Sequence, residues 1–203
     1  MSSPRDSSPG RFRGIVPGMN PPFSVSPPST GSADGQVRRA CTVADVERMV
    51  EVGIVGHEER LEIVAGEIIP MSPKGNRHEI LKQHLNRHFG RRLPDAYTYI
   101  QEAGWHLGET LYLEPDFLFF PAATPLAAVK GADALLVVEV SDSSLGWDLG
   151  RKPALYGAEG VREYWVVDAV TRTTHVHLLP AAGGYGSVRA YGAEVEQAPH
   201  LLP

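Results

Sequence analysis

Two apolar runs, separated by a segment of helical length, constrain the fold more than any other feature of this sequence. The first run covers residues 134–141 and the second covers residues 163–168. Continuous runs of this kind are typical of central strands that are covered on both faces. The intervening residues 148–159 are followed by Gly160, which is the usual end of a helix. A strand, a helix and a further strand form a crossover unit, so the two strands are predicted to be parallel neighbours in an α/β fold.

An acidic residue interrupts the first of these runs. Glu139 lies among Leu, Val and Val residues, where a carboxylate is costly to bury unless a partner compensates its charge. Asp116 opens another apolar run earlier in the chain, and Lys152 follows near the start of the predicted helix. Two acids and a lysine on adjacent elements would form a site for a divalent cation and a phosphate ester.

These residues suggest a specific division of labour. Asp116 and Glu139 would hold Mg²⁺ or Mn²⁺, with the carbonyl of Val140 as a third oxygen ligand. Lys152 would orient the attacking water and hold negative charge in the transition state. Two alternatives stay open: Asp116 could be an exposed strand-start residue beside a proline, and Lys152 could pair with Asp148, which would cap the helix.

The first part of the folded chain predicts a helix and a hairpin. Thr42 and Asp45 resemble a capping box that begins a helix reaching about residue 52. Residues 61–64 and 67–71 flank Ala65-Gly66, which is a hairpin signal. Within this hairpin, the alternating pattern favours Glu62 on the wet face of its strand, and the alternative is that it points into a site.

Residues 74–92 predict the one clearly basic helix of an otherwise acidic chain. A single acid, Glu79, stands against its basic residues, which are Lys74, Arg77, Lys82, Arg87, Arg91 and Arg92. The two interpretations are a solvated helix face and a helix that contacts the phosphate backbone of DNA. His78, near its start, is the histidine that most suggests a function, although a single histidine is more often structural.

The remaining apolar runs predict further strands. Residues 97–107 and 111–120 are joined by a short antiparallel connection, and residues 173–179 and 187–191 form a hairpin around Gly183-Gly184.

The two ends of the chain are predicted to lie outside the folded body. Residues 1–40 are rich in Ser, Pro and Gly and predict a disordered tail, because such a segment buries too little surface to offset its ordering entropy. We expect a folded domain over residues 41–198 and loose residues after it.

Composition excludes several classes of protein. No apolar run approaches the roughly 18 residues of a membrane span, and the N-terminus lacks the apolar centre of a signal peptide. Cys41 is the single cysteine, which suits a reducing cytoplasm, where we expect the protein. The formal net charge is −5, so any contact with nucleic acid must come from a local basic patch. No glycine-rich phosphate loop, Cys-x-x-Cys pair or His-Glu-x-x-His helix is present in the sequence.

Several segments resemble the Uma2 family of endonucleases, also called DUF820, within the PD-(D/E)xK nuclease superfamily. The resemblance covers roughly residues 42–180. Its motifs are RLEIVAGEI at 60–68, MSP at 71–73 followed by His78, EPD at 114–116, VEVSD at 138–142, DLGRK at 148–152 with Tyr156, and GVREYWVVD at 160–168.

The resemblance implies a restriction-endonuclease-like α/β core with a mixed central sheet flanked by helices, plus an N-terminal helix and hairpin. It also implies a divalent metal, DNA as substrate and often a homodimer. Carried over by position, Asp116 and Glu139 become the metal-binding acids and Lys152 the catalytic lysine. Glu62 and His78 match further positions near the site, where they would assist binding or proton transfer as further catalytic-site residues. The superfamily's lysine usually stands two residues after the second acid, but Ser141 occupies that place here.

The predicted function is a Mg²⁺-dependent endonuclease that hydrolyses DNA phosphodiester bonds. The alternative is a non-catalytic nucleic-acid or protein-binding module that retains the nuclease fold, for which the acidic net charge and Ser141 leave room. A third and weaker hypothesis is a metal-dependent hydrolase of another ester.

Overall fold

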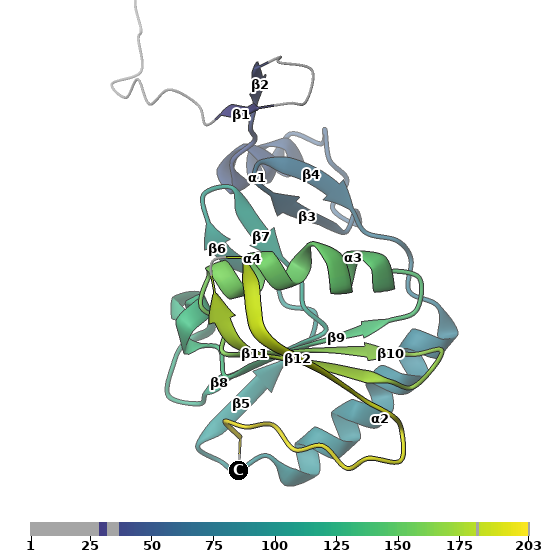
Figure 1. Ribbon diagram of the computed structural model, residues 1–203. Coiled ribbons are helices and arrows are strands. Elements are labelled where there is room, and N and C mark those ends of the chain that lie inside the picture. Colours follow the sequence, from purple (N-terminus) through teal and green to yellow (C-terminus); the bar gives the residue numbers. More distant parts are fainter. Residues whose placement is uncertain (1–28, 32–36, 182, 203) are drawn as a thin grey trace, which may run out of the picture.

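The computed structural model describes residues 29–31, 37–181 and 183–202, and its main body is built around a central mixed sheet (Figure 1). Within these residues the central sheet has six strands in the order β12-β11-β10-β9-β8-β5. The strands are β5 Tyr97–Ile100, β8 Phe117–Pro121, β9 Leu136–Ser141, β10 Glu163–Asp168, β11 Thr174–Ala181 and β12 Gly184–Tyr191. Only β9 and β10 pair in parallel, as the crossover pattern predicts, and every other pair in the sheet is antiparallel.

Helices cover both faces of this sheet. α2, Asn76–Arg92, lies on one face, and α3, Leu145–Gly150, and α4, Lys152–Ala158, lie on the other (Figure 1). Short 3₁₀ turns at Leu126–Ala128 and Gly131–Asp133 precede β9. None of the helices in the described ranges combines the length and apolar character needed to cross a bilayer.

A smaller sheet and the first helix lie beyond α3 and α4 (Figure 1). The described part of this sheet has the order β4-β3-β7-β6, with β3 at Leu61–Val64, β4 at Glu67–Pro70, β6 at Trp105–Gly108 and β7 at Leu111–Leu113. The predicted hairpin around Ala65-Gly66 is confirmed by the β3–β4 pairing. Gly66 has a φ of +77°, and a Cβ there would collide with Ala40, so the turn requires glycine.

The predicted capping box is also confirmed. α1 runs over Val43–Glu51, and its cap residue Thr42 accepts the backbone N–H of Asp45 at 3.0 Å. The carboxylate of Asp45 accepts the backbone N–H of Thr42 at 2.9 Å in return. Two N-terminal donors of the helix are therefore satisfied by local contacts, which is why the sequence alone could locate this end.

The strands predicted at 97–107 and 111–120 are each divided between the two sheets, so their predicted lengths are wrong. β5 and β8 pair in the central sheet, whereas β6 and β7 pair in the small one. The break falls at Glu102, which has a φ of +51° and donates its backbone N–H to the carbonyl of Pro115 at 3.1 Å. Pro115 has no N–H to continue a ladder, so both strands leave the sheet at this point.

The single helix predicted at 148–159 is two helices. α3 begins before the predicted start and ends at Gly150, and α4 begins at Lys152 after a break at Arg151. Pro153 lacks the N–H that a continuous helix would require, and it is tolerated in the first turn of α4. Asp148 therefore lies inside α3, and the prediction that it caps the helix is wrong. Gly160 follows α4 with a φ of +79°, as predicted for its end.

The two ends of the chain contain more structure than expected. Ser29–Gly31 and Val37–Arg39 form a two-stranded antiparallel pair, β1 and β2, inside the segment predicted as a disordered tail. Residues 1–28 and 32–36 lie outside the described residues, so for them disorder stays a prediction. Near the other end, His200 donates its backbone N–H to Glu163 at 2.8 Å and Leu202 is buried, so these residues are not loose. The predicted C-terminal hairpin is confirmed by the β11–β12 pairing.

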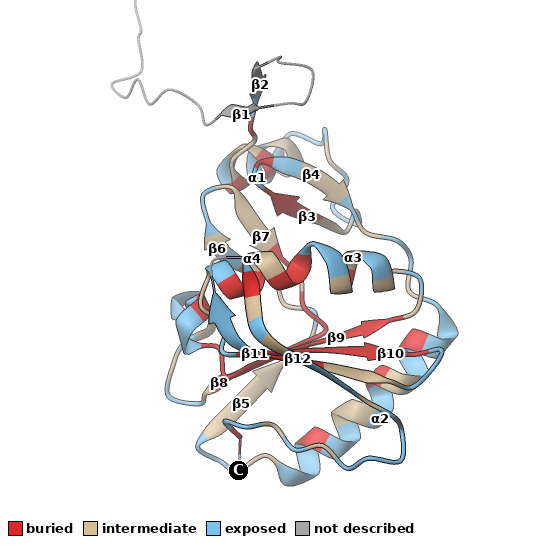
Figure 2. Ribbon diagram, in the orientation of Figure 1, coloured by how far each residue is buried: buried red, intermediate tan, exposed pale blue. Residues whose placement is uncertain are grey.

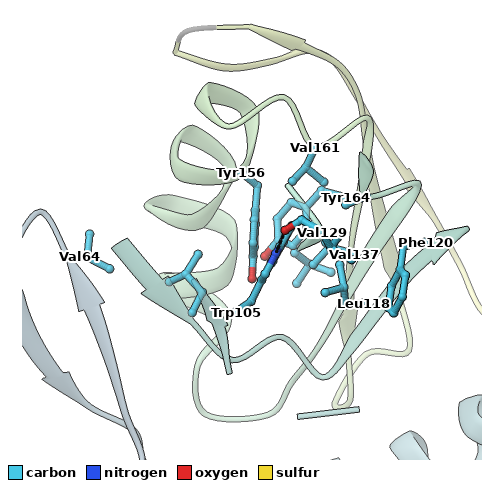
Figure 3. Packing of buried hydrophobic residues seen from close by; sticks show 12 residues of the cluster. Val64, Trp105, Leu118, Phe120, Val129, Val137, Tyr156, Val161 and Tyr164 are labelled. Carbon is cyan, nitrogen blue, oxygen red and sulfur yellow. Dashed lines mark hydrogen bonds between the residues drawn. The ribbon is translucent and has the colours of Figure 1, made fainter. Parts of the chain in front are cut away.

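Alternation along the strands of the central sheet divides the core residues packed on its two faces into two clusters. Phe117 and Phe119 of β8 face α2, and Leu118 and Phe120 face α4. Figure 2 shows β9 and β10 buried along their whole length, which confirms the prediction of central strands covered on both faces. On the α4 side, Tyr156, Trp105 and Tyr164 pack together between helix and sheet (Figure 3).

Candidate active site

Two neighbouring strands of the central sheet bring the predicted acids together. β8 and β9 are antiparallel, and Phe117 lies opposite Val138. Continuing this register by one residue places Asp116 opposite Glu139. The backbone N–H of Asp116 donates to Oε2 of Glu139 at 3.3 Å, and the backbone N–H of Val140 donates to Oδ2 of Asp116 at 2.8 Å. Both carboxylates are 4% exposed, so the interpretation of Asp116 as an exposed turn residue is wrong.

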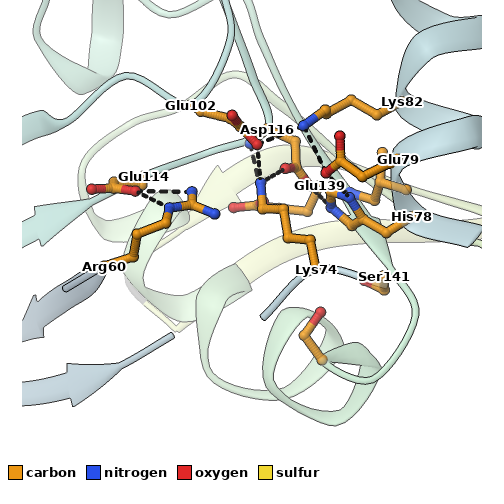
Figure 4. A network of polar contacts seen from close by, with 12 residues as sticks. Arg60, Lys74, His78, Glu79, Lys82, Glu102, Glu114, Asp116, Glu139 and Ser141 are labelled. Carbon is orange, nitrogen blue, oxygen red and sulfur yellow. Dashed lines mark hydrogen bonds and ion pairs between the residues drawn. The ribbon is translucent and has the colours of Figure 1, made fainter. Parts of the chain in front are cut away.

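Donors surround the carboxylate of Asp116 (Figure 4). Its Oδ1 accepts a hydrogen bond from Nζ of Lys74 at 2.6 Å, and its Oδ2 lies 3.0 Å from Nε2 of His78. Burial alone would raise the pKa of Asp116, but the His78 hydrogen bond and the charge of Lys74 outweigh burial and hold the pKa well below its ordinary value. Asp116 is therefore ionised at neutral pH, which is the form that binds a cation.

The carboxylate of Glu139 depends on α4 for its partners. Its Oε1 accepts hydrogen bonds from Nζ of Lys152 at 2.7 Å and from the hydroxyl of Tyr156 at 2.9 Å. Burial raises the pKa of Glu139, the charge of Lys152 opposes this, and the nearby carboxylates of Asp148 and Asp116 add to the rise. The charge of Lys152 thus favours the carboxylate form, but burial outweighs it and the pKa of Glu139 is raised to about 8.

Lys152 lies among three carboxylates. Its ammonium lies 2.7 Å from Glu139, 3.0 Å from Glu62 and 3.4 Å from Asp148, and the residue is 3% exposed. Burial alone would lower the pKa of Lys152, but these carboxylates outweigh it and raise the pKa above its ordinary value. Lys152 therefore keeps its proton and can act as a fixed positive charge, not as a base. The alternative pairing with Asp148 is present, but the contact with Glu139 is shorter.

Ser141 of β9 and Lys152 of α4 contact the same carboxylate, that of Asp148. The buried hydroxyl of Ser141 donates to Oδ2 of Asp148 at 2.7 Å, and Oδ1 of the same carboxylate is the one that contacts Lys152. The side chain of Lys152 thus reaches the carboxylate that Ser141 binds.

Glu62 points into this cluster, so the favoured interpretation of a wet strand face is wrong. It is 2% exposed, and its carboxylate accepts the indole N–H of Trp147 at 3.1 Å and lies beside Lys152. β3 belongs to the small sheet, whose face packs toward α3 and α4, and the alternation of one isolated strand could not reveal this.

The basic helix α2 contributes fewer surface charges than predicted. Lys82 is buried and donates to Glu79 at 2.9 Å and to Glu102 at 2.6 Å, and Lys74 contacts Glu102 and Asp116 (Figure 4). These two lysines are therefore paired in the interior and are not free for phosphate. The exposed basic residues in this segment are Arg77, Arg87, Arg91 and Arg92.

The side chains predicted for the site line a pocket of about 330 Å³. Asp116, Glu139, Glu62, Lys152 and His78 all contribute to its wall. Its rim includes Ser72, Pro73, Gly75 and Ser143, which are exposed, so the pocket reaches the surface. The structure thus brings all five predicted side chains to one accessible cavity, together with Val140.

A profile of the Uma2 family, described as a putative restriction endonuclease, matches residues 43–203. The chain belongs to the Uma2 family. A solved structure with a similar fold, described as a putative nuclease belonging to DUF820 from Anabaena variabilis, shares 14% sequence identity with a TM-score of 0.57. The similarity covers 78% of this chain and 88% of the Anabaena chain. None of the curated proteins compared matches this chain. The predicted α/β fold with a mixed central sheet is confirmed.

The Uma2 pocket has a donor set that suits a hard divalent cation. Mg²⁺ and Mn²⁺ prefer oxygen ligands, and Mg²⁺ is commonly held by one or two carboxylates while waters complete its shell. Adjacent carboxylates of Asp116 and Glu139 on the pocket wall match this requirement. In the described part of the chain no three His, Cys, Asp or Glu side chains are grouped as metal ligands, and a two-carboxylate site does not need a third.

Sequence reasoning missed several residues of the Uma2 site. Tyr156 stands four residues after Lys152 on the same helix face, so helical spacing could have assigned it to the site. Trp147 carried no such signal, and it contacts Glu62 only because the small sheet packs on α3. Lys74 and Glu102 are distant in sequence, and only the packing of α2 against the strand break brings them together.

Proposed function

We propose that this protein is a divalent-metal-dependent endonuclease that hydrolyses DNA phosphodiester bonds, with Asp116 and Glu139 as metal ligands. The observation that carries the proposal is the convergence of these two acids, from adjacent strands, with Lys152 in one pocket that reaches the surface. Membership of the Uma2 family supports the nuclease activity. The carbonyl of Val140, at the same strand end, is the proposed third ligand.

The bound cation would lower the pKa of a water molecule and neutralise charge on the phosphate. Lys152 would supply a fixed positive charge beside Glu139, which would stabilise the negative charge that develops on the non-bridging oxygens of the phosphate. Its raised pKa keeps the charge in place through the working pH range.

The other site residues position these groups. Glu62 and Asp148 hold the ammonium of Lys152, and Tyr156 fixes Oε1 of Glu139. His78 contacts Oδ2 of Asp116 and so orients the carboxylate.

The DNA backbone would lie along the exposed arginines of α2. Arg77 lies 3.6 Å from Asp142, which lines the pocket, so it marks where the basic face meets the site. Arginine makes bidentate contacts with phosphate. We also propose a homodimer, which light scattering of the purified protein measures directly.

Cleavage of supercoiled plasmid with Mg²⁺ or Mn²⁺ tests the enzymatic proposal. Asp116→Asn and Lys152→Met are expected to lower the rate by at least about 100-fold, as for other groups that stabilise transition-state charge. The exposed residues Asp95 and Lys130 lie outside the pocket, so Asp95→Asn and Lys130→Met are matched controls that should cleave like the wild type. Equal cleavage by all five proteins would show that the activity lies elsewhere.

One observation favours the alternative of a non-catalytic binding module with the nuclease fold. The carboxylates of Asp116 and Glu139 are already paired with Lys74 and Lys152, as in a structural ion network. Calorimetry with Mn²⁺ separates the two functions, because an enzyme must bind the cation through Asp116 and a binding module need not.

A further inference from the structure

The two oxygens of Asp116 have partners of different kinds. Oδ2 is held by the backbone N–H of Val140 at 2.8 Å and lies 3.0 Å from His78, both fixed by secondary structure. Oδ1 is held by Lys74, whose ammonium sits at the end of a flexible side chain in the loop before α2. Oδ1 is therefore the oxygen that a cation from solution can reach, and Lys74 occupies it.

Lys74 has a second acceptor already in contact. Its ammonium also donates to Glu102, which accepts a hydrogen bond from Lys82 at 2.6 Å as well (Figure 4). The side chain of Lys74 is 15% exposed and lines the pocket, so it borders open space into which it can move. If Lys74 leaves Asp116, it loses one ion pair and keeps the other.

The position of Glu102 is fixed by an unusual backbone. A φ of +51° is strained for a residue other than glycine, and such strain persists only where the surroundings impose it. Here the backbone N–H of Glu102 donates to the carbonyl of Pro115, the residue that precedes Asp116. The same contact therefore aligns the acceptor of Lys74 with the proposed metal ligand.

We propose that Lys74 is a tethered counter-ion of Asp116 that a divalent cation must displace, and that Glu102 retains the displaced ammonium. The inference rests on the proposed function in that it takes Asp116 as a ligand of the cation. Because the ammonium and the cation compete for Oδ1, Lys74 weakens metal binding. Glu102 reduces this loss of affinity, because it still pairs with the displaced ammonium. Lys74 and Glu102 are positioning residues, since they act through Asp116.

Calorimetric titration with Mn²⁺ tests the competition without any reliance on cleavage. Lys74→Met removes the competing charge and is expected to bind Mn²⁺ on the order of tenfold more tightly than the wild type, within the usual range for coupled sites. Glu102→Gln is expected to bind several-fold more weakly, because the displaced lysine then has no carboxylate to receive it. Lys130→Met, at an exposed site outside the pocket, should match the wild type.

A double-mutant cycle distinguishes this coupling from a general effect of charge. In the Lys74→Met background, Glu102→Gln should change the affinity much less than it does in the wild type, because its effect passes through Lys74. Equal effects in both backgrounds would overturn the role of Glu102. Circular dichroism checks folding, and Lys74→Gln replaces the methionine variant if that variant unfolds.

The outcomes separate this inference from the proposed function. If the wild type binds Mn²⁺ and loses binding in Asp116→Asn, but Lys74→Met binds no more tightly, the counter-ion proposal is overturned and the metal site stands. If binding persists in Asp116→Asn, or if neither the wild type nor Lys74→Met binds, the metal site itself is wrong and the inference falls with it.

Discussion

Replacement of Lys152 by methionine should destabilise the protein in a strongly pH-dependent manner. Methionine retains most of the packing of the lysine stem but removes the charge that lies within 3.4 Å of three carboxylates. Breaking a buried ion pair by removal of one partner costs about 3–5 kcal/mol. Since Lys152 is 3% exposed, solvent screening does little to reduce this cost, and we expect the full range above pH 8, where Glu139 is ionised.

The pH dependence follows from Glu139. Burial already raises its pKa from the ordinary value of 4.5 to about 8, and removal of Lys152 raises it further. A carboxyl whose folded-state pKa is raised binds a proton more tightly in the folded than in the unfolded chain, so it lowers stability as pH rises above 4.5. Below about pH 8 both folded proteins hold this proton, so the deficit of the variant should be smaller there and should grow as pH rises above 8.

Urea denaturation of the wild type and Lys152→Met, at pH values from about 6 to 9.5, measures the difference in free energy of unfolding across the raised pKa of Glu139. Lys130→Met is the control, because this exposed lysine should change stability by less than about 0.5 kcal/mol at every pH. A deficit below about 1 kcal/mol at the upper end of this range would refute the strength assigned to the ion cluster. A deficit that is constant across the range would refute the role of Glu139.

Three further predictions test the surroundings of the site. Tyr156→Phe keeps the ring but removes the hydroxyl that donates to Glu139 at 2.9 Å, so urea denaturation should show a loss of about 1.5–3 kcal/mol; no loss would mean that this bond is not needed. Burial alone would raise the pKa of Glu102, but the hydrogen bonds from Lys74 and Lys82 outweigh burial and lower the pKa to about 2. The contribution of Glu102 to stability is therefore present above pH 4.5 and is lost as pH falls toward 2. Glu102→Gln should therefore show a lower melting temperature at neutral pH and a flatter decline below pH 4.5, and parallel declines would contradict this. Phe89→Ala should lower the free energy of unfolding by about 3–5 kcal/mol in the same urea assay. The ring of Phe89 packs edge-on against Phe119 between α2 and the sheet, with 4.9 Å between the ring centroids. A loss below about 1 kcal/mol would contradict this packing.

The pattern of consecutive residues was enough to predict the centre of the fold. The run at 134–141 and the run at 163–168 became β9 and β10, paired in parallel as predicted. The unfavourable burial of Glu139 pointed to an interior partner, and Lys152 is that partner. These inferences succeeded because apolar runs and the desolvation cost of a charge are properties of short segments.

The errors concern contacts between segments that are distant in sequence. The alternation of apolar and polar residues in its strand predicts that Glu62 faces solvent. The packing of the small sheet instead directs its side chain toward Lys152. Lys82 was counted as a surface charge of α2, yet it is buried against Glu102. No local pattern could have revealed either pairing, since each depends on which element packs against the strand or helix.

The sequence by itself determined the order of the main elements and which residues would need a charged partner, because strand and helix periodicity and the cost of desolvation act on neighbouring residues. Only the tertiary structure decided which partner each charge received. The division of two predicted strands at Glu102 and Pro115 brought Lys74 to Asp116, and the packing of the small sheet brought Glu62 to Lys152. Coulomb attraction and burial depend on distances through space, and those distances are set when the sheets and helices pack.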